Sequence, residues 1–164
     1  MSSFLFVLMQ IATLAYALIG GVFLAFSDFI MRSLAITGGP ATMQVINREV
    51  FHWIFMALFL GMAGVSLLIV GYAAISLSGP GSTLILLSGI IYLIGCFGVT
   101  VFFNVPMNEA LAGMEPDAEA TLQYWIATYG PRWAFWNSIR SIACAISAAF
   151  LLFGLMRVVQ SQQG

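Results

Sequence analysis

Apolar residues are concentrated in four long runs of this chain, and polar residues lie mainly in the segments between them. The runs extend over residues 4–27, 51–75, 82–103 and 134–158. Each contains the roughly 20 residues that an α-helix needs to cross a bilayer. Closed β-barrels, which also span membranes, require short segments of alternating polarity that this sequence lacks. The pattern therefore predicts an all-α fold, a four-helix transmembrane bundle organised as a single integral membrane domain over residues 1–164.

The segments between the runs differ in length and in their turn signals. Residues 78–81, with the sequence Ser-Gly-Pro-Gly, predict a tight turn between the second and third spans. Residues 30–48 join the first and second spans, and residues 105–132 join the third and fourth. Within the last connection, residues 116–129 begin with a proline and two acidic residues and continue with aromatic residues. This order predicts a short interfacial helix between spans three and four.

Composition and charge agree with a membrane protein. The chain is 62% hydrophobic and 7% charged, whereas about a quarter of the residues of a soluble domain are charged. A net charge of -1 with five basic residues offers no basic patch, so we expect no nucleic-acid partner. We expect a multi-pass protein of the cell membrane whose partners are membrane lipid and a hydrophobic small molecule. A homo-oligomer is left open.

The unusual polar residues gather at one end of the predicted bundle. Successive spans run in opposite directions, so the two long connections lie at the same end. The polar residues in or beside these connections are Asp28, Arg32, Asn47, Arg48, Glu49, His52, Asn104, Asn108, Asn137 and Arg140. Every span thus contributes polar groups to one mouth, where we expect a site. Arginines in the long connections predict that this mouth faces the cytoplasm.

The fourth span opens with the most informative motif, Trp133-Ala134-Phe135-Trp136-Asn137-Ser138-Ile139-Arg140. Positions i, i+3, i+4 and i+7 of a helix share one face, which groups both tryptophans with the Asn and the Arg. Arg140 would lie about 10 Å along the helix from Trp133. A charge at that depth faces a partner or a wet cavity, so it marks a functional site. We take Arg140 and Asn137 as catalytic candidates and Trp133 and Trp136 as substrate-binding candidates, with a membrane-interface belt as the alternative for the tryptophans.

Two more residues are candidates for a catalytic base. His52 is the single histidine, and its side chain has the unperturbed pKa nearest to neutrality; a structural role at the interface is the alternative. Asp28 lies four residues before Arg32, so an exposed ion pair is the alternative to a site role. Three small residues share the helix face of Asp28: Ala17, Gly21 and Ala25. Such residues are typical of close helix contacts, which predicts that Asp28 points into the bundle.

The remaining substrate-binding candidates are asparagines and one arginine at the borders of the spans. Asn47 and Arg48 stand together before the second span, where they suit a carbonyl or phenol oxygen. Asn104 and Asn108 bracket a proline where the third span ends. Capping of helix ends is the alternative for the asparagines. Cys96 and Cys144 fall inside apolar runs and are predicted to be buried small hydrophobic residues.

A metal site is a further alternative because Glu49 and His52 form a Glu-x-x-His sequence. Di-iron helix bundles use two such motifs with two additional glutamates, and this chain has one motif and no acidic residue in its third and fourth apolar runs. A mononuclear site formed by Asp28, Glu49 and His52 is the remaining option. We predict no cofactor and leave a metal open.

Four segments carry a family resemblance, and they are residues 21–27, 43–48, 98–108 and 133–140. In this order they resemble the small four-helix membrane proteins related to anthrone oxygenase, many of which are grouped as a domain of unknown function. The Asn-x-Pro-x-Asn sequence at 104–108 and the Trp-x-x-Trp-Asn-x-x-Arg sequence at 133–140 are the most specific parts. One departure is Phe51-His52, where many relatives have Asn-Pro near the start of the second span.

The resemblance implies an oxidation of an anthrone to a quinone. Loss of a proton from an activated methylene leaves a delocalised oxyanion that can pass an electron to O2 without a cofactor. Trp133 and Trp136 would form a flat slot, Arg140 and Asn137 would stabilise the oxyanion, and His52 or Asp28 would be the base. The function hypothesis is a membrane oxygenase or oxidoreductase for a hydrophobic phenolic or anthrone- or quinone-like substrate.

Two non-enzymatic functions stand beside this hypothesis. The first is a lipid- or quinone-binding module, or a small subunit of a membrane complex, which fits the small residues on the helix faces. The second is a pore, which is disfavoured because charges confined to one end do not make a continuous pathway through the membrane.

Overall fold

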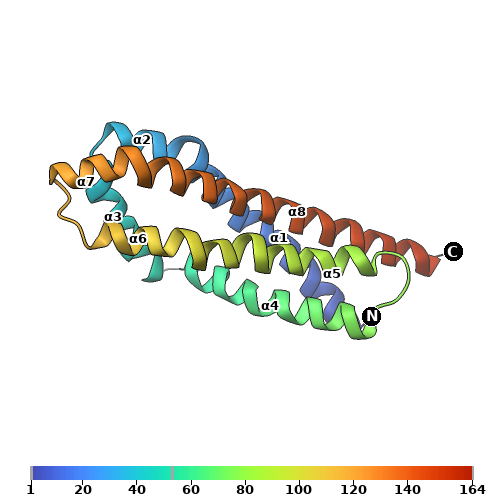
Figure 1. Ribbon diagram of the computed structural model, residues 1–164. Helices are drawn as coiled ribbons and strands as arrows, with labels where there is room; N and C mark the ends of the chain where they lie inside the picture. The colour runs from blue at the N-terminus through green and yellow to red at the C-terminus, as the bar shows by residue number, and fades with distance from the viewer. Residues whose placement is uncertain (1, 53, 164) are drawn as a thin grey trace.

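The computed structural model describes residues 2–52 and 54–163, and these residues contain helices and turns but no strand. Four helices are long and apolar enough to cross a membrane, and they extend over Ser3–Ile36, Ile54–Ser76, Ser82–Ala112 and Glu119–Gln162. Figure 1 shows them lying lengthwise beside one another, with both termini at the end that holds the turn between the second and third helices. The prediction of an all-α fold with four candidate spans is confirmed.

Each long helix is built from shorter elements. The first consists of α1 (Ser3–Ala25), η1 (Phe26–Ile30) and α2 (Met31–Ile36). A connection formed by α3 (Gly39–Glu49) and η2 (Val50–His52) leads to the second, α4 (Ile54–Ser76). The third consists of α5 (Ser82–Ile91), η3 (Tyr92–Gly98), η4 (Thr100–Asn104) and α6 (Val105–Ala112). The fourth consists of α7 (Glu119–Tyr124), η5 (Trp125–Tyr129) and α8 (Gly130–Gln163).

Four of these elements, η1, η3, η4 and η5, are π-helical. Their wider turns are visible in backbone hydrogen bonds that join residues five apart, such as Met31 N–H to the Phe26 carbonyl and Gly130 N–H to the Trp125 carbonyl. Short π segments inside α-helices are frequent at functional sites. Three of them, η1, η4 and η5, lie toward the end of the bundle that carries α3, α6 and α7.

The opposite half of the bundle is closely packed. Gly20 of α1 touches α8, since a Cβ on this glycine would lie 2.9 Å from the Cβ of Cys144. Buried tyrosines have partners on other helices: Tyr16 bonds to Ser66 at 2.7 Å, and the Tyr92 hydroxyl donates to the Phe59 carbonyl at 2.9 Å. Small contact residues and interhelical hydrogen bonds are what hold helices together where water is absent.

The two cysteines belong to this packed half. Cys96 and Cys144 are both fully buried, and their sulfur atoms lie 3.3 Å apart between the third and fourth helices. Their predicted burial is confirmed. The turn between the second and third helices is also found where it was predicted. Gly81 has φ +93° and packs against the carbonyl of Gly154, so both its backbone conformation and its close contact favour glycine.

The predicted inward direction of Asp28 is wrong. Ala17 and Gly21 lie on an exposed face of α1, and no atom lies within 4 Å of a Cβ placed on Gly21. Asp28 is exposed on the same side and forms an ion pair with Arg32. The helix contact is made one position earlier, by Gly20. Small residues alone did not identify the contact face, because a lipid-facing surface also accepts them.

The segment between the third and fourth spans also differs from the prediction. α7 is helical, but it continues through η5 into α8 as one long helix. Trp125 and Tyr129, expected as interfacial anchors, are buried against Met43 and Leu111. Gly39 lies under the Trp125 ring, where a Cβ would overlap the indole. An interfacial position for α7 stays a prediction.

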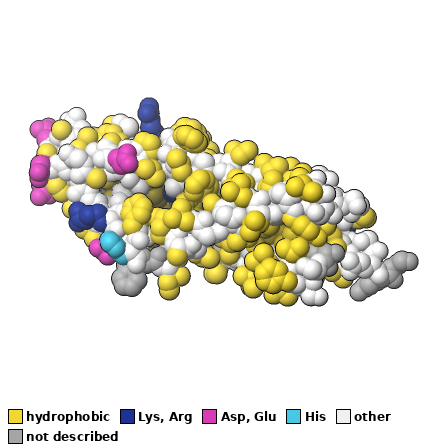
Figure 2. All heavy atoms as spheres, turned by 90° about the horizontal axis from the view of Figure 1, so that it is seen from below, with side chains coloured by type: hydrophobic (Ala, Val, Ile, Leu, Met, Phe, Trp, Pro, Cys, Tyr) yellow, Lys and Arg dark blue, Asp and Glu magenta, His cyan; other side chains and the backbone are white. Residues whose placement is uncertain are grey.

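Charged side chains are concentrated at the end with the long connections. Figure 2 shows acidic, basic and histidine side chains gathered over that end of one face, and mainly hydrophobic side chains along the rest. The exposed hydrophobic residues include Phe4, Leu14, Leu67, Ile94 and Phe153. Such a surface suits lipid contact along the length of the helices and water at one end.

Candidate functional site

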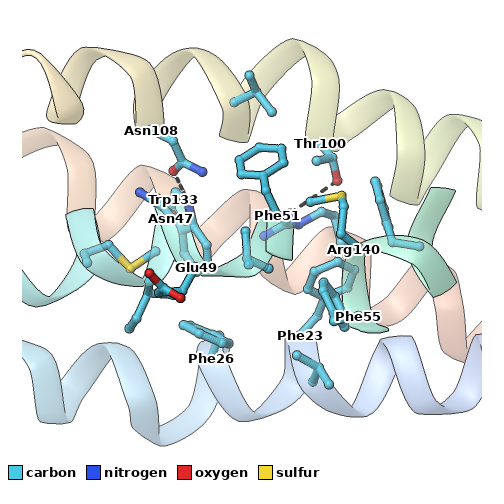
Figure 3. A pocket seen from close by; sticks show the side chains of 17 residues that line it. Phe23, Phe26, Asn47, Glu49, Phe51, Phe55, Thr100, Asn108, Trp133 and Arg140 are labelled. Atoms are coloured by element: carbon cyan, nitrogen blue, oxygen red, sulfur yellow. Dashed lines mark hydrogen bonds between the residues drawn. The ribbon is translucent and has the colours of Figure 1, made fainter. Parts of the chain in front are cut away.

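A cavity of about 380 Å³ lies near the charged end, between the four long helices and the α3–η2 connection. Its walls are mainly apolar, and half of the apolar residues are aromatic: Phe23, Phe26, Phe51, Phe55, Phe59 and Trp133. A few polar side chains interrupt this lining: Asn47, Glu49, Thr100, Asn108 and Arg140. Figure 3 shows these side chains converging from several helices. A mostly apolar hollow with few polar groups is typical of a small-molecule site.

Arg140 is the charged group most deeply set in this wall. Its side chain is 5% exposed. One terminal nitrogen donates to Thr100 Oγ1 at 3.2 Å, and the other donates to Asn137 Oδ1. The guanidinium also lies over two rings, 4.1 Å from the centre of Phe23 and 5.2 Å from the centre of Trp133. Its Nε has no partner among the described residues.

No carboxylate of the described residues forms an ion pair with this guanidinium, although Glu49 lines the same cavity. Within the described residues the one ion pair joins Asp28 to Arg32 on the surface, so the Arg140 guanidinium has only neutral neighbours. Burying a charged side chain costs several kcal/mol after relaxation, whereas a cation–π contact contributes about 0.5–2 kcal/mol. The contacts present therefore offset only part of the cost, and an anion in the cavity would supply the rest.

Asn137 holds Arg140 in place rather than lining the cavity. It is fully buried, and its Nδ2 donates to the Phe23 carbonyl and to Ser27 Oγ of η1. Its Oδ1 accepts the bond from Arg140. All of its hydrogen bonds are thus made to the protein. The amide joins α8 to the first helix and fixes the guanidinium toward Thr100.

A second polar cluster lies around Asn108. Its Oδ1 accepts hydrogen bonds from the Tyr129 hydroxyl at 2.8 Å and from Trp133 Nε1 at 2.9 Å. Asn47 Nδ2 donates to the same tyrosine hydroxyl at 3.4 Å. Tyr129 is fully buried on η5, so this network joins α3 and α6 to the fourth long helix, through η5 and α8.

The structure brings together four of the predicted site residues and separates the others. Arg140, Trp133, Asn47 and Asn108 all line the cavity. Asn104 is buried behind it and donates to the Trp133 carbonyl at 3.4 Å. Trp136 is stacked on Phe103, with ring centres 3.7 Å apart, and does not line the cavity.

Arg48 and His52 belong to a neighbouring cavity of about 520 Å³, together with Glu109. This second cavity shares the wall residues Asn47, Phe51, Val105 and Asn108 with the first. Asp28 lines neither of them. The trio of Asp28, Glu49 and His52 therefore does not form a metal site: among the residues described, no group of three or more potential ligands of this kind comes together.

Sequence reasoning missed Thr100 and the phenylalanines as cavity residues. Glu49 was predicted to lie at the mouth, but its only proposed role was as a metal ligand. Thr100 lies one turn before Asn104, which was the signal available for it. The phenylalanines lie within apolar runs, where a cavity wall and a lipid-facing surface look alike.

Comparison with known proteins gives one result. A family model described as anthrone oxygenase matches residues 48–150, more than half of the chain. The matched segment contains Asn108, Trp133, Asn137 and Arg140, whereas Asn47 and the first helix lie before it. No curated protein and no solved structure matches the chain.

Proposed function

Because the chain belongs to the anthrone oxygenase family, we propose that it is a membrane oxygenase for a hydrophobic phenolic or anthrone- or quinone-like substrate. The observation that carries the proposal is the buried Arg140 guanidinium, which has no carboxylate partner and forms part of an aromatic cavity wall. A polycyclic phenol offers both a flat apolar body for the aromatic wall and an oxygen for the cation.

The proposed reaction converts an activated methylene to a carbonyl with O2. A base removes one methylene proton, and the remaining carbanion is delocalised onto the substrate oxygen. The carbanion carbon then transfers an electron to O2 and combines with it. One oxygen atom stays in the new carbonyl, and the other leaves as water with the two methylene hydrogens. This balance requires no other reductant.

Arg140 supplies the stabilisation that such a reaction needs. The charge that develops on the substrate oxygen faces a donor fixed in advance by Thr100 and Asn137. Donors of this kind act strongly where water is excluded, and removal of one costs about 10²–10³-fold in kcat. Trp133 and the phenylalanines around it bind the ring system. Asn137 acts as a positioning residue, because its amide touches Arg140 and not the cavity.

Glu49 is the base in this proposal. It is the one carboxylate among the described residues that line the cavity, and a positioned carboxylate contributes about 10²–10⁴-fold to proton transfer. His52, predicted as a base from the sequence, lies in the neighbouring cavity. We assign it no part in the proton transfer, and we assign none to Asp28 because of its outward direction.

We also propose the placement of the protein. Its four long apolar helices would cross the cell membrane, with α7 at the interface and lipid around the exposed apolar faces. Arg32, Arg48 and Arg132 at the cavity end favour the cytoplasmic side for that end. Entry of the substrate into the cavity from the membrane surface suits a compound that is poorly soluble in water.

The test is oxygen consumption by the detergent-purified protein with anthrone as substrate, followed together with the absorbance of the quinone formed. Arg140→Ala is expected to lower kcat by about 10²–10³-fold. Arg157→Ala is the matched control, since this arginine is exposed at the opposite end of α8, and it should leave the rate unchanged. Turnover by Arg140→Ala at the wild-type rate would contradict the proposal.

The non-enzymatic alternative, a quinone-binding module, draws on the same apolar cavity. It would be favoured by tight binding of a quinone together with no oxygen consumption for any anthrone. Loss of that binding in Arg140→Ala would then still identify the cavity as the ligand site.

A further inference from the structure

The hydrogen-bond network around Asn108 leaves one donor and one acceptor free at the cavity wall. Trp133 Nε1 can only donate a hydrogen bond, so the atom of Asn108 that it contacts must be the amide oxygen. The Tyr129 hydroxyl contacts the same oxygen at 2.8 Å. With its oxygen occupied twice, Asn108 keeps its Nδ2 group for the cavity, because both cavities are lined by this residue.

The same reasoning fixes the amide of Asn47. Tyr129 has a single hydroxyl proton, which it gives to Asn108 Oδ1, so its oxygen must accept from Asn47. The group of Asn47 that faces the tyrosine is therefore the nitrogen, and its Oδ1 stays free. Neither Asn108 Nδ2 nor Asn47 Oδ1 has a hydrogen-bond partner within the part of the chain that the structure describes.

We propose that Asn108 and Asn47 together recognise a hydroxyl group of the ligand, at a point that the Trp133 ring separates from the oxygen that faces Arg140. A hydroxyl fits both free groups, because it accepts from Asn108 Nδ2 and donates to Asn47 Oδ1. An ether or carbonyl oxygen fits only the first, and a hydrocarbon edge fits neither. The inference rests on the proposed function only in assuming that the ligand of this cavity is a polycyclic aromatic compound.

The Trp133 ring separates the two polar points. Its Nε1 contacts Asn108 at 2.9 Å, and the Arg140 guanidinium lies 5.2 Å from the centre of the same ring. Figure 3 shows Asn108 and Arg140 on opposite sides of the drawn cavity, with aromatic side chains between them. A ligand that reaches both is therefore a rigid ring system with oxygen substituents at two ends.

The protein itself stabilises this recognition point. Tyr129 is fully buried and stacks on Trp125, with ring centres 5.1 Å apart, and on Trp133, with ring centres 6.4 Å apart. The hydroxyl is thus held where it meets both asparagines, and neither amide can rotate without losing a bond to it. Asn108 and Asn47 are specificity-determining residues in this proposal, and Tyr129 is a positioning residue.

The inference is tested by binding, with quinones that need no turnover. The probes are 9,10-anthraquinone, its 2-hydroxy derivative and its 2-methoxy derivative, titrated into the detergent-purified protein by isothermal calorimetry. Wild type is expected to bind the hydroxy compound about tenfold more tightly than the unsubstituted one, the effect of one or two net hydrogen bonds. The methoxy compound should fall between them, because it only accepts.

Asn108→Asp is the sharpest variant, since it keeps the oxygen that Tyr129 and Trp133 require and replaces only the free donor. A carboxylate accepts from a hydroxyl but cannot donate to an ether oxygen, so the methoxy compound should lose its advantage over unsubstituted anthraquinone. Asn108→Leu, which adds no charge, should abolish the preference for the hydroxy compound and change the affinity for unsubstituted anthraquinone less than threefold. Glu109→Gln, the next residue of α6 and outside the first cavity, is the control and should keep the wild-type preference.

The results separate the inference from the proposed function. Equal binding of the hydroxy and unsubstituted quinones by wild type, or an unchanged methoxy advantage in folded Asn108→Asp together with an unchanged hydroxy preference in folded Asn108→Leu, would overturn the recognition of a hydroxyl. If the anthrone reaction still depended on Arg140 in that case, the proposed function would stand without the recognition of a hydroxyl. If wild type bound none of the three quinones, both the proposed function and the recognition of a hydroxyl would be contradicted.

Discussion

The two ends of the bundle use the same four helices in opposite ways. From the middle of the bundle toward the termini, Gly20 brings α1 against α8, and the buried hydroxyls of Tyr16 and Tyr92 have partners on neighbouring helices. At the other end the helices contain π turns and enclose a cavity, and Arg140 keeps an unpartnered Nε. One end consists of helices in mutual contact, and the other encloses a cavity of a size suited to a small molecule.

The difference teaches how a small membrane protein can support an unbalanced buried charge. A cation such as Arg140 costs stability, and the one ion pair among the described residues, Asp28–Arg32, lies on the surface and does not involve it. The interhelical contacts of the closely packed half are a source of stability that can offset this cost. Active sites often retain strained or unsatisfied groups because these groups support activity, although they lower the stability of the fold.

The largest expected effect compares two carboxylates at the cavity end. Glu49→Gln removes the proposed base from the cavity and should lower kcat for anthrone by about 10²–10⁴-fold. Asp28→Asn removes an exposed carboxylate that pairs with Arg32, and it should leave kcat unchanged and alter stability by less than about 1 kcal/mol. Oxygen uptake measures the first effect and thermal unfolding the second. Equal losses of activity in the two variants would sink the assignment of the base.

A second variant makes the cavity end resemble the packed end by giving Arg140 a partner. Thr100 already contacts the guanidinium at 3.2 Å, so Thr100→Asp would place a carboxylate beside it. Stability should rise, by about 3 °C in the unfolding midpoint, because the buried charge gains a counter-ion. Activity should fall about 10²-fold, since the substrate oxyanion then competes with a fixed anion.

Thr100→Val is the control for that variant. It removes the same hydroxyl without adding a charge, so it should lower both stability and activity modestly. If Thr100→Asp kept wild-type turnover, or if both substitutions changed stability equally, the view of Arg140 as an unbalanced cation would be wrong.

The smallest effect on activity is expected from the packed end. Gly20→Val places side-chain atoms against Cys144 and should destabilise the fold by about 1–3 kcal/mol, the usual cost of overpacking. The turnover of the protein that remains folded should stay within twofold of wild type. Gly21→Val, one position on, meets nothing within 4 Å and should be nearly neutral. A loss of turnover without a loss of stability in Gly20→Val would show that the two ends are coupled.

Much of the fold could be predicted from hydropathy. Three of the four apolar runs lie within long helices that continue past them, as from residue 103 to Ala112 and from residue 134 back to Glu119. The second run begins in η2, before the long helix Ile54–Ser76. Hydropathy detects the apolar part that fits a bilayer and not the polar turns that extend beyond it. The clustering of polar residues at one end could also be predicted, because successive spans run in opposite directions.

The candidate site was predicted in part. Arg140 and Trp133 came from helical spacing, and Asn47 and Asn108 came from their position beside the long connections. Tyr129 could not be identified, because its partners come from distant segments. Asp28 could not be oriented, because a helix face of small residues suits lipid as well as protein. The π segments have no known signature in sequence.

Those π segments have a consequence for how the site can change. A π turn is equivalent to one residue added to a regular helix. Removal of one residue within 101–103 would convert the wide turn to an α-helical turn and leave the residues on both sides in nearly their present orientation. Thr100 would still meet Arg140, and Asn108 would still meet Trp133. The same deletion in a regular α-helical stretch would rotate everything that follows by about 100°, so the π segments are the places where the third helix can lose a residue without separating the two polar points of the cavity.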